Sequence, residues 1–331
     1  MTRRHQTWQD PDRDAPIGPV AILDPMPQAI QEQVRRLATG LDLRFAASPS
    51  PTDFAAAVRG APYIVPRSLA LPAEILRNAD AVRLIHQWGT GYDGIPLDVA
   101  RAMGVPVARS PGVNAPTVAD LTIGLFIATL RRIPQLHLAT CAGDWAPSAL
   151  VSGARDLNGL TIGLIGFGAI GQVVARRLSG FDCDVMYHRR SGPVERSTAR
   201  PASMDDILST CDIVSLHLPL TEASRHLIGA DQLARMKPGS VLINTSRGGL
   251  IDEPAMCAAL QGGPLGAAGL DVFAQEPVNP DNPLLRMHNV VALPHIGGRT
   301  DDNLARMVRH WAGNIRAFHA GRGIDAACLV T

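Results

Sequence analysis

LTIGLIGFGAIG, at residues 160–171, is the stretch of sequence that most strongly predicts the fold. An apolar strand, Thr161–Ile165, leads into a turn with three glycines, and a helix follows directly. The first glycine, Gly166, permits a tight turn, and the second, Gly168, lets a pyrophosphate approach the backbone. The third, Gly171, allows the helix to pack closely on the strand. Because a helix N-terminus also favours an anion, the stretch predicts a dinucleotide-binding unit, with a purely structural turn as the alternative.

Short apolar runs alternate with amphipathic segments on both sides of this turn, which is typical of a parallel α/β fold. The further strands are expected at Val20–Leu23, Tyr63–Val65, Leu84–Gln87, Asp184–Tyr187, Ile213–Leu216, Val241–Asn244, Gly266–Leu270 and Val290–Ala292. The helices are expected at Gln28–Ala38, Pro72–Asn78, Thr117–Ile133, Gly171–Ser179, Ser203–Ser209, Pro254–Leu260 and Asp301–His319. Strands with helical crossovers over about 180 residues match a doubly wound nucleotide-binding domain.

The composition excludes several classes of protein. A length of 331 residues suggests two domains, and 46% hydrophobic against 18% charged residues exclude a disordered polyelectrolyte. The 31 basic and 30 acidic residues leave a net charge of +1, which argues against nucleic acids or membrane surfaces as partners. The most apolar stretch, Val118–Leu130, is shorter than the ~20 residues of a membrane span. Residues 1–16 are polar and predict a flexible tail rather than a secretory signal.

The five cysteines are scattered along the chain without a Cys-x-x-Cys pair. This distribution predicts a reducing, cytoplasmic location, and it favours neither a disulfide framework nor a zinc site. The ten histidines are also dispersed, so we expect no metal site.

The end of the second strand indicates which dinucleotide binds. An NAD site places an acidic residue there, about 20 residues after the glycine-rich turn, to accept hydrogen bonds from the ribose. This chain instead continues with Arg189, Arg190 and Ser191. Guanidinium groups pair with a 2′-phosphate in a planar fork, so the strand end favours NADP(H). NAD remains the second possibility, and a solvated basic loop is the structural alternative.

Several blocks, in this order, make the sequence resemble the D-isomer-specific 2-hydroxyacid dehydrogenases: residues 107–119 (VARSPGVNAPTVA), 160–171 (LTIGLIGFGAIG), 217–221 (HLPLT), 241–253 (VLINTSRGGLIDE), 269–277 (GLDVFAQEP) and 294–298 (PHIGG). The resemblance implies a Rossmann-type doubly wound parallel sheet inserted into a smaller, flavodoxin-like α/β substrate domain. The implied domains are a flexible tail at 1–16, the substrate domain at 17–111 and 295–331, and the dinucleotide-binding domain at 112–294. From composition alone, the Pro- and Gly-rich segment at 110–116 is either this domain crossing or an ordinary loop.

The resemblance also implies three catalytic residues. Arg247 would bind the substrate carboxylate and keto oxygen, a role that suits a rigid and always charged pair of donors. His295 would be the general acid that protonates the developing alkoxide, and Glu276 would hold its imidazole in the protonated form. Each residue taken alone has a structural alternative: a cap for Arg247, a surface position for Glu276 and a structural histidine for His295.

The remaining site residues are likewise implied by matching positions. The cofactor-binding set is Gly166, Gly168, Ala169, Ile170, Gly171, Arg189, Arg190, Ser191, His217, Pro219, Thr221, Thr245, Ser246, Arg247, Asp271, His295 and Gly297. Asp271 would meet the nicotinamide carboxamide, and its alternative is a helix cap. The substrate would be bound by the backbone of Trp88, Gly89, Thr90 and Gly91, together with Arg247 and His295. Arg67 matches an arginine that in some relatives reaches a distal anion, a role that stays open here.

The function predicted from these residues is reduction of a small 2-keto acid, such as glyoxylate or hydroxypyruvate, with NADP(H). Phosphoglycerate or phosphite oxidation on the same fold is the alternative enzyme activity, whereas Glu276 argues against formate, because formate dehydrogenases of this fold generally have Gln there. A nucleotide-sensing, corepressor-like protein is the non-enzymatic alternative. The resemblance also implies a homodimer, to which the apolar helix at 117–133 could contribute, although burial within the monomer explains that helix equally well.

Overall fold

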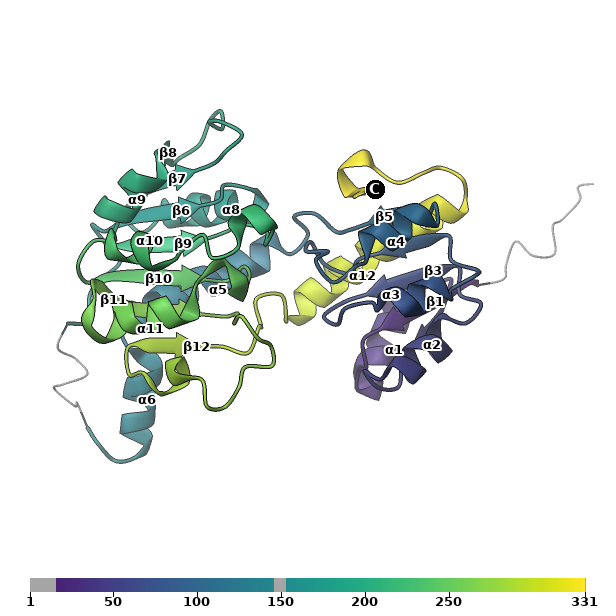
Figure 1. The fold of residues 1–331 in the computed structure, drawn as a ribbon, viewed down its shortest axis with the longest axis horizontal. Coiled ribbons are helices and arrows are strands. Elements are labelled where there is room, and N and C mark those ends of the chain that lie inside the picture. Colours follow the sequence, from purple (N-terminus) through teal and green to yellow (C-terminus); the bar gives the residue numbers. More distant parts are fainter. Residues whose placement is uncertain (1–15, 146–152, 331) are drawn as a thin grey trace, which may run out of the picture. The chain divides into compact units, whose positions relative to one another are not determined.

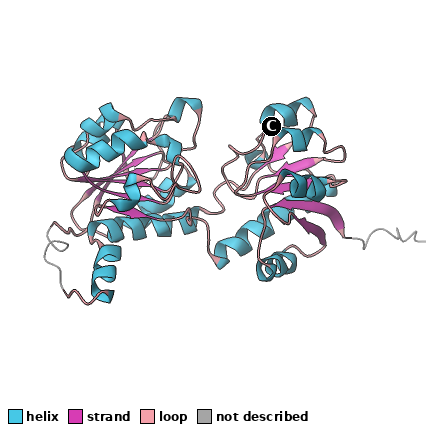
Figure 2. Cartoon of the chain, turned by 60° about the horizontal axis from the view of Figure 1, so that its bottom comes forward, coloured by secondary structure: helices cyan, strands magenta, loops and turns pink. Residues whose placement is uncertain are grey.

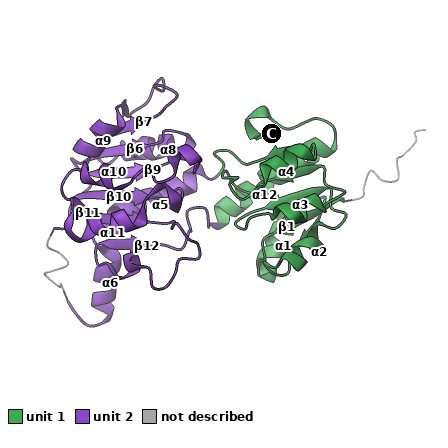
Figure 3. Ribbon diagram, viewed as in Figure 1, with its two compact units in different colours: residues 1–113, 301–331 green, residues 114–300 purple. Residues whose placement is uncertain are grey.

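The computed structural model of the chain describes residues 16–145 and 153–330, which form two compact units (Figures 1 and 3). Unit 1 contains the described residues up to Val113 and those from Asp301 onward, and unit 2 contains those from Asn114 to Thr300. Unit 2 is therefore inserted into unit 1. The predicted flexible tail lies outside the described residues except for Pro16.

Unit 1 has a five-stranded sheet in the order β2-β1-β3-β4-β5, with every neighbouring pair parallel. This order is that of flavodoxin, so the predicted fold class is confirmed for unit 1. Its elements are β1 (Ile17–Leu23), α1 (Gln28–Leu37), β2 (Leu41–Phe45), α2 (Pro51–Val58), β3 (Tyr63–Pro66), α3 (Ala73–Arg77), β4 (Leu84–His86), α4 (Leu97–Ala102), β5 (Val107–Ala108), α12 (Asp301–His319) and η4 (Ala326–Cys328).

Alternate side chains of β1 explain how unit 1 is layered. Ala21 and Leu23 pack into one hydrophobic core with residues of α2, α3 and α4, and Val20 and Ile22 pack into another with residues of α1 and α12. Successive side chains of a strand point to opposite faces, so helices cover both faces of the sheet (Figure 2). A sheet buried on both faces needs continuous apolar strands, and this is why these runs were recognisable in the sequence.

Unit 2 has a seven-stranded parallel sheet in the order β12-β11-β10-β9-β6-β7-β8. Its first six strands follow the Rossmann order, with β12 added at one edge, which confirms the predicted doubly wound fold. The elements are α5 (Ala115–Leu130), α6 (Ile133–Cys141), β6 (Thr161–Ile165), α8 (Ala169–Leu178), β7 (Asp184–His188), β8 (Arg200–Pro201), α9 (Met204–Thr210), β9 (Ile213–Leu216), η1 (Glu222–Ser224), α10 (Ala230–Ala234), β10 (Ser240–Asn244), η2 (Gly248–Leu250), α11 (Glu253–Gly262), β11 (Leu265–Leu270), η3 (Pro283–Arg286) and β12 (Val290–Ala292).

The end of one helix and both boundaries between the units differ from the expectations. The helix expected at 117–133 ends at Leu130, because Arg132 adopts a left-handed backbone conformation (φ 51°) and Pro134 lies in the first turn of a separate helix, α6. The second boundary between the units lies after Thr300 rather than after residue 294. Residues 295–300 belong to unit 2, where the backbone amides of Ile296 and Gly297 are bound by Asp271. The first boundary lies two residues later than expected, after Val113 rather than after residue 111.

Candidate active site

The glycine-rich turn joins β6 to α8. Two of its glycines leave no room for a side chain, and the third faces open space. Gly166 has a φ of 100°, and a Cβ on it would lie 2.3 Å from the carbonyl oxygen of His217. A Cβ on Gly171 would lie 2.5 Å from the oxygen of Gly166, so neither position accepts a side chain. A Cβ on Gly168, in contrast, would meet no atom within 4 Å. The second glycine therefore leaves open space at the N-terminus of α8, as a bound pyrophosphate requires.

His217 follows β9, the strand that pairs with β6 where the strand order of the sheet reverses. Ligands of open α/β sheets bind at such a switch point. The Nε2 atom of His217 lies 3.0 Å from the Ser215 hydroxyl, whereas its buried Nδ1 atom has no hydrogen-bond partner among the described residues. Burial lowers the pKa of His217 to about 4, so the ring is neutral near pH 7. A buried polar atom without a protein partner fits a site that holds a polar ligand.

Two more residues of this loop were predicted to bind the cofactor. Pro219 is exposed, and its carbonyl oxygen accepts a hydrogen bond from the hydroxyl of Ser224. Thr221 is exposed as well, and its backbone N–H also bonds to that hydroxyl, at the start of η1. Their hydrogen bonds therefore shape the turn after β9.

The end of β7 lies beside the glycine-rich turn, because His188 pairs in register with Ile165 and accepts a hydrogen bond from the Gly166 amide at 3.0 Å. Arg189 and Arg190 follow His188, and both are exposed. Neither guanidinium has an ion pair or hydrogen bond within residues 16–145 and 153–330. Ser191 is exposed beside them. The strand end therefore presents two uncompensated positive charges next to the turn.

Glu276 and His295 form a short hydrogen bond in the candidate site. Oε2 of Glu276 lies 2.6 Å from Nδ1 of His295, and Oε1 accepts the backbone N–H of Phe273 at 3.1 Å. Burial would raise the pKa of Glu276, but these hydrogen bonds and the charges of His295 and Arg247 together lower it below its usual value. Glu276 is therefore an ionised acceptor that orients the imidazole through Nδ1. The His295 side chain is 44% exposed, and its Nε2 has no hydrogen bond to the described chain.

Asp271 fixes the turn that carries His295. It is 1% exposed, and its two carboxylate oxygens accept the backbone N–H groups of Ile296 at 2.8 Å and Gly297 at 2.7 Å. Burial raises the pKa of Asp271 despite these hydrogen bonds. His295 itself adopts a left-handed conformation with φ 52°, which is unfavourable for a residue with a Cβ and needs support from its surroundings. The sequence did not reveal this anchoring role, although a carboxylate at the end of a buried strand was a usable signal.

Arg247 is positioned by a turn at the end of β10. Asn244 is fully buried: its side-chain amide donates to the Arg247 carbonyl at 2.9 Å, and its side-chain oxygen accepts the Ser246 amide at 3.0 Å. A Cβ on Gly248 would lie 1.9 Å from the Phe273 carbonyl carbon, so the turn packs directly against the loop that leads to Glu276. This close approach explains how the charge of Arg247 acts on Glu276. Asn244 and Gly248 were both missed as positioning residues in the sequence.

The two residues before Arg247 have structural contacts of their own. The Thr245 hydroxyl lies 3.0 Å from that of Thr122 in α5, and the Ser246 hydroxyl donates to the carbonyl of Leu216 at the end of β9. The structure thus brings Arg247, Glu276 and His295, which are far apart in sequence, together at the carboxyl edge of one sheet.

The predicted substrate residues of unit 1 follow β3 and β4. Trp88 is 4% exposed, and its amide donates to the carbonyl of Pro66 at 2.8 Å. The expectation that this amide binds the substrate is therefore wrong. An anion could be bound only by the amides that follow it in the loop Gly89–Gly91. Thr90 pins this loop through a hydrogen bond from its hydroxyl to the Ser110 carbonyl. Arg67 is paired with Asp24 at 2.6 Å.

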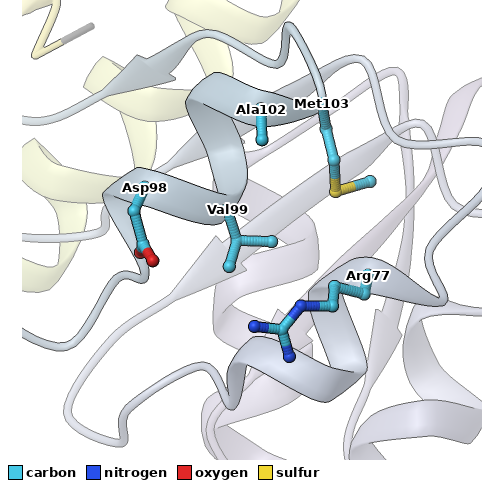
Figure 4. A pocket seen from close by; sticks show the side chains of 5 residues that line it. All are labelled: Arg77, Asp98, Val99, Ala102 and Met103. Atoms are coloured by element: carbon cyan, nitrogen blue, oxygen red, sulfur yellow. The ribbon is translucent and has the colours of Figure 1, made fainter.

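A cavity of about 340 Å³ lies elsewhere in unit 1, between α3 and α4 (Figure 4). It is lined by Arg77, Asp98, Val99, Ala102 and Met103, none of which was predicted to belong to the site. In the described part of the chain, no three His, Cys, Asp or Glu side chains gather as metal ligands. Within the same residues, every helix is too short or too polar to cross a bilayer.

Comparisons with known proteins agree with this geometry. The sequence model described as D-isomer specific 2-hydroxyacid dehydrogenase, NAD binding domain, matches residues 123–297. A glyoxylate reductase of Korarchaeum cryptofilum is 38% identical over 256 residues, which is 76% of this chain and 77% of that protein. Glyoxylate/hydroxypyruvate reductase B of Salmonella schwarzengrund is 39% identical over 77% of this chain and 80% of its own length. The crystal structure of a glyoxylate reductase from Paecilomyes thermophila superposes with a TM-score of 0.79 at 30% identity, covering 95% of this chain and 98% of that one.

Proposed function

The chain belongs to the D-isomer-specific 2-hydroxyacid dehydrogenase family, and from that premise we propose that it reduces small 2-keto acids to D-2-hydroxy acids with NADPH. Glyoxylate and hydroxypyruvate are the proposed substrates, because the similar proteins from Korarchaeum and Salmonella carry these names. The observation that carries the proposal is the hydrogen bond of 2.6 Å between Glu276 and His295, next to the charge of Arg247.

Each of the three residues has a distinct chemical part. Bound NADPH would supply the hydride for the keto carbon. Glu276 holds the imidazole of His295 through Nδ1, and Nε2, which no described residue binds, would donate the proton to the developing alkoxide. Arg247 presents a planar, permanently charged fork for the carboxylate and keto oxygen. Asp271 and Asn244 act through these residues, because they hold the turns on which His295 and Arg247 lie.

The preference for NADPH over NADH rests on the end of β7. No acidic residue stands between Tyr187 and Ser191 to accept the ribose hydroxyls, and the side chains of Arg189 and Arg190 are exposed. Two guanidiniums that have no partner within residues 16–145 and 153–330 favour a 2′-phosphate. Measuring KM for NADPH and NADH in the wild type and in Arg189→Asp tests this: NADPH should be preferred, and the variant should lose much of that preference. Equal use of both nucleotides by the wild type would contradict the assignment.

Turnover of a panel of 2-keto acids tests the activity itself. Purified protein should oxidise NADPH, followed by its absorbance, with glyoxylate and hydroxypyruvate. Phosphoglycerate and phosphite, tested with the oxidised nucleotide, serve as the alternative substrates. Turnover of either in preference to every keto acid would replace the proposed reaction, and no turnover with any compound would contradict it.

We propose a homodimer in which α5 and α6 take part. Figure 1 shows α6 extending away from the body of unit 2, and none of its residues is buried. Ile133 is 49% exposed, Leu138 67% and the nearby Trp145 85%, which is unusual for large apolar side chains on one segment. Size-exclusion chromatography with light scattering should give twice the chain mass, and Leu138→Glu should shift the protein toward monomer.

We also propose a cytoplasmic location, since all five cysteines are free thiols.

A further inference from the structure

The ends of β1 and β3 carry an ion pair that the proposed reaction does not use. Leu23 and Pro66 are paired in register, so the residues that follow them, Asp24 and Arg67, leave neighbouring strands side by side. β1 and β3 form the switch point of the sheet of unit 1, the edge at which flavodoxin-like sheets bind ligands. Nη1 of Arg67 lies 2.6 Å from Oδ2 of Asp24.

Arg67 is held in this arrangement from several sides. The Gln87 side chain donates to the Arg67 carbonyl at 2.9 Å, and the guanidinium lies 5.4 Å from the centre of the Trp88 ring. The Asp24 side chain is 12% exposed and that of Arg67 is 28% exposed, so water screens the pair only partly. Trp88 begins the loop whose amides are proposed to bind the substrate carboxylate. The ion pair therefore lies beside this loop, within unit 1.

The pairing changes what Arg67 offers a substrate. A free arginine at this position would attract a second anionic group, such as a phosphate or a distal carboxylate. Asp24 neutralises that charge and places its own carboxylate within reach of the same group, and like charges at such a distance repel. A substituent without charge, such as hydrogen or hydroxymethyl, meets neither an unmatched cation nor a repelling anion.

We infer that Asp24 is a specificity-determining residue, which restricts the enzyme to 2-keto acids with a single negative charge by neutralising Arg67. This inference rests on the proposed function and narrows its substrate class. It differs from the role that the sequence left open for Arg67, because the arginine would bind a distal anion only after Asp24 has been removed.

The experiment measures kcat/KM for two monoanionic keto acids, glyoxylate and hydroxypyruvate, and two with a second anion, oxaloacetate and phosphohydroxypyruvate. The quantity compared is the ratio of the second pair to the first, in the intact enzyme with its preferred nucleotide. Asp24→Asn has nearly the same shape as the wild type and should raise this ratio by roughly tenfold or more, because Arg67 becomes an unmatched cation. The matched control is Asp80→Asn, which removes one exposed carboxylate of the same unit after α3 and should leave the ratio unchanged.

Arg67→Gln gives an independent arm, should Asp24→Asn fold poorly. It leaves the Asp24 carboxylate alone, so the ratio should fall by roughly tenfold relative to the wild type. A wild type that turns over both pairs equally well, or a ratio that neither variant moves, would overturn the inference while leaving the proposed function intact. If no keto acid is turned over at all, the proposed function fails instead, and the two failures are distinguishable in the same assay.

Discussion

The two edges of the sheet in unit 2 differ in whether their polar side chains have hydrogen-bond partners. At the amino edge, Asp212 precedes β9 and is 5% exposed. Its carboxylate accepts hydrogen bonds from Arg155 at 2.8 Å, Lys237 at 2.8 Å and the Thr161 amide at 3.0 Å. At the carboxyl edge, the buried Nδ1 of His217 has no hydrogen-bond partner among the described residues. His295 is bound to the described chain through Nδ1, which leaves its Nε2 open to solvent.

This difference separates stability from chemistry. The amino edge contains a satisfied cluster, which ties the starts of β6, β9 and β10 together. The carboxyl edge contains polar groups that are held in place but not satisfied, as a site for a ligand requires. His295 even keeps a left-handed backbone, supported by the Asp271 carboxylate beneath its turn. Variants at the amino edge should therefore change the free energy of unfolding, and variants at the carboxyl edge should change turnover.

His295→Ala should have the largest effect on the carboxyl edge. Without the general acid, kcat should fall by about 100- to 10,000-fold, because the alkoxide loses its proton donor. The side chain is 44% exposed, so thermal stability and nucleotide affinity should change little. Steady-state kinetics, fluorescence titration with NADPH and a melting curve check the three quantities. An alanine variant with normal kcat would remove the basis for the mechanism.

Asp212→Ala tests the amino edge. It leaves Arg155 and Lys237 without their shared acceptor. Because these side chains are 40% and 42% exposed, water partly replaces the carboxylate, and the unfolding free energy should fall by about 1.5–3 kcal/mol. The fraction that remains folded should keep its kcat, since the cluster lies at the opposite edge from His295. Chemical denaturation and an assay at low temperature measure the two effects. Unchanged stability, or a loss of kcat in fully folded protein, would contradict the division between the edges.

The pH dependence of stability probes the same carboxylate. Burial would raise the pKa of Asp212, but the hydrogen bonds from Lys237, Thr161 and Arg155 prevail and lower it from 3.8 to about 2. A carboxylate whose pKa is lower in the folded chain stabilises it above the unfolded pKa and loses that effect as the pH falls toward 2. The contribution is about 2 kcal/mol. Denaturation between pH 5 and pH 2 should show this loss in the wild type and not in Asp212→Asn, which serves as the control.

Asp271→Asn tests how much catalysis depends on the hydrogen bonds that fix the turn carrying His295. The amide keeps the shape of the side chain but replaces one of the two acceptor oxygens that bind the Ile296 and Gly297 amides. The turn should loosen, and kcat should fall by roughly 10- to 100-fold, less than for His295→Ala. KM for the nucleotide should change less than kcat if the main role of Asp271 is positioning. A larger effect on nucleotide affinity than on kcat would favour direct contact with the carboxamide, as the resemblance implied.

The sequence was sufficient to locate an element where one local pattern of residues determines the structure. The apolar strands of unit 2 and the turn at Gly166–Gly171 were located because a strand buried on both faces and a tight turn each leave a clear composition. β8, in contrast, is two exposed residues, and β2 begins with a mixed run, so neither has such a pattern. The anchoring by Asp271 and the pairing of Asp24 with Arg67 depend on residues far apart in sequence, and such contacts follow only from the folded chain.

Exchanging single glycines in the cofactor turn gives the smallest expected effect and the sharpest comparison within one loop. A Cβ at Gly168 meets no atom within 4 Å, so Gly168→Ala should keep the wild-type melting temperature and weaken NADPH binding by roughly tenfold, because the methyl group occupies space needed by the pyrophosphate. Gly166→Ala is the matched control. Its φ of 100° and the 2.3 Å approach to the His217 oxygen predict lower stability as well as weaker binding. If Gly168→Ala bound NADPH with wild-type affinity, the open space before α8 would not be where the pyrophosphate lies. If both variants lowered the melting temperature equally, the assignment of different roles to the two glycines would be wrong.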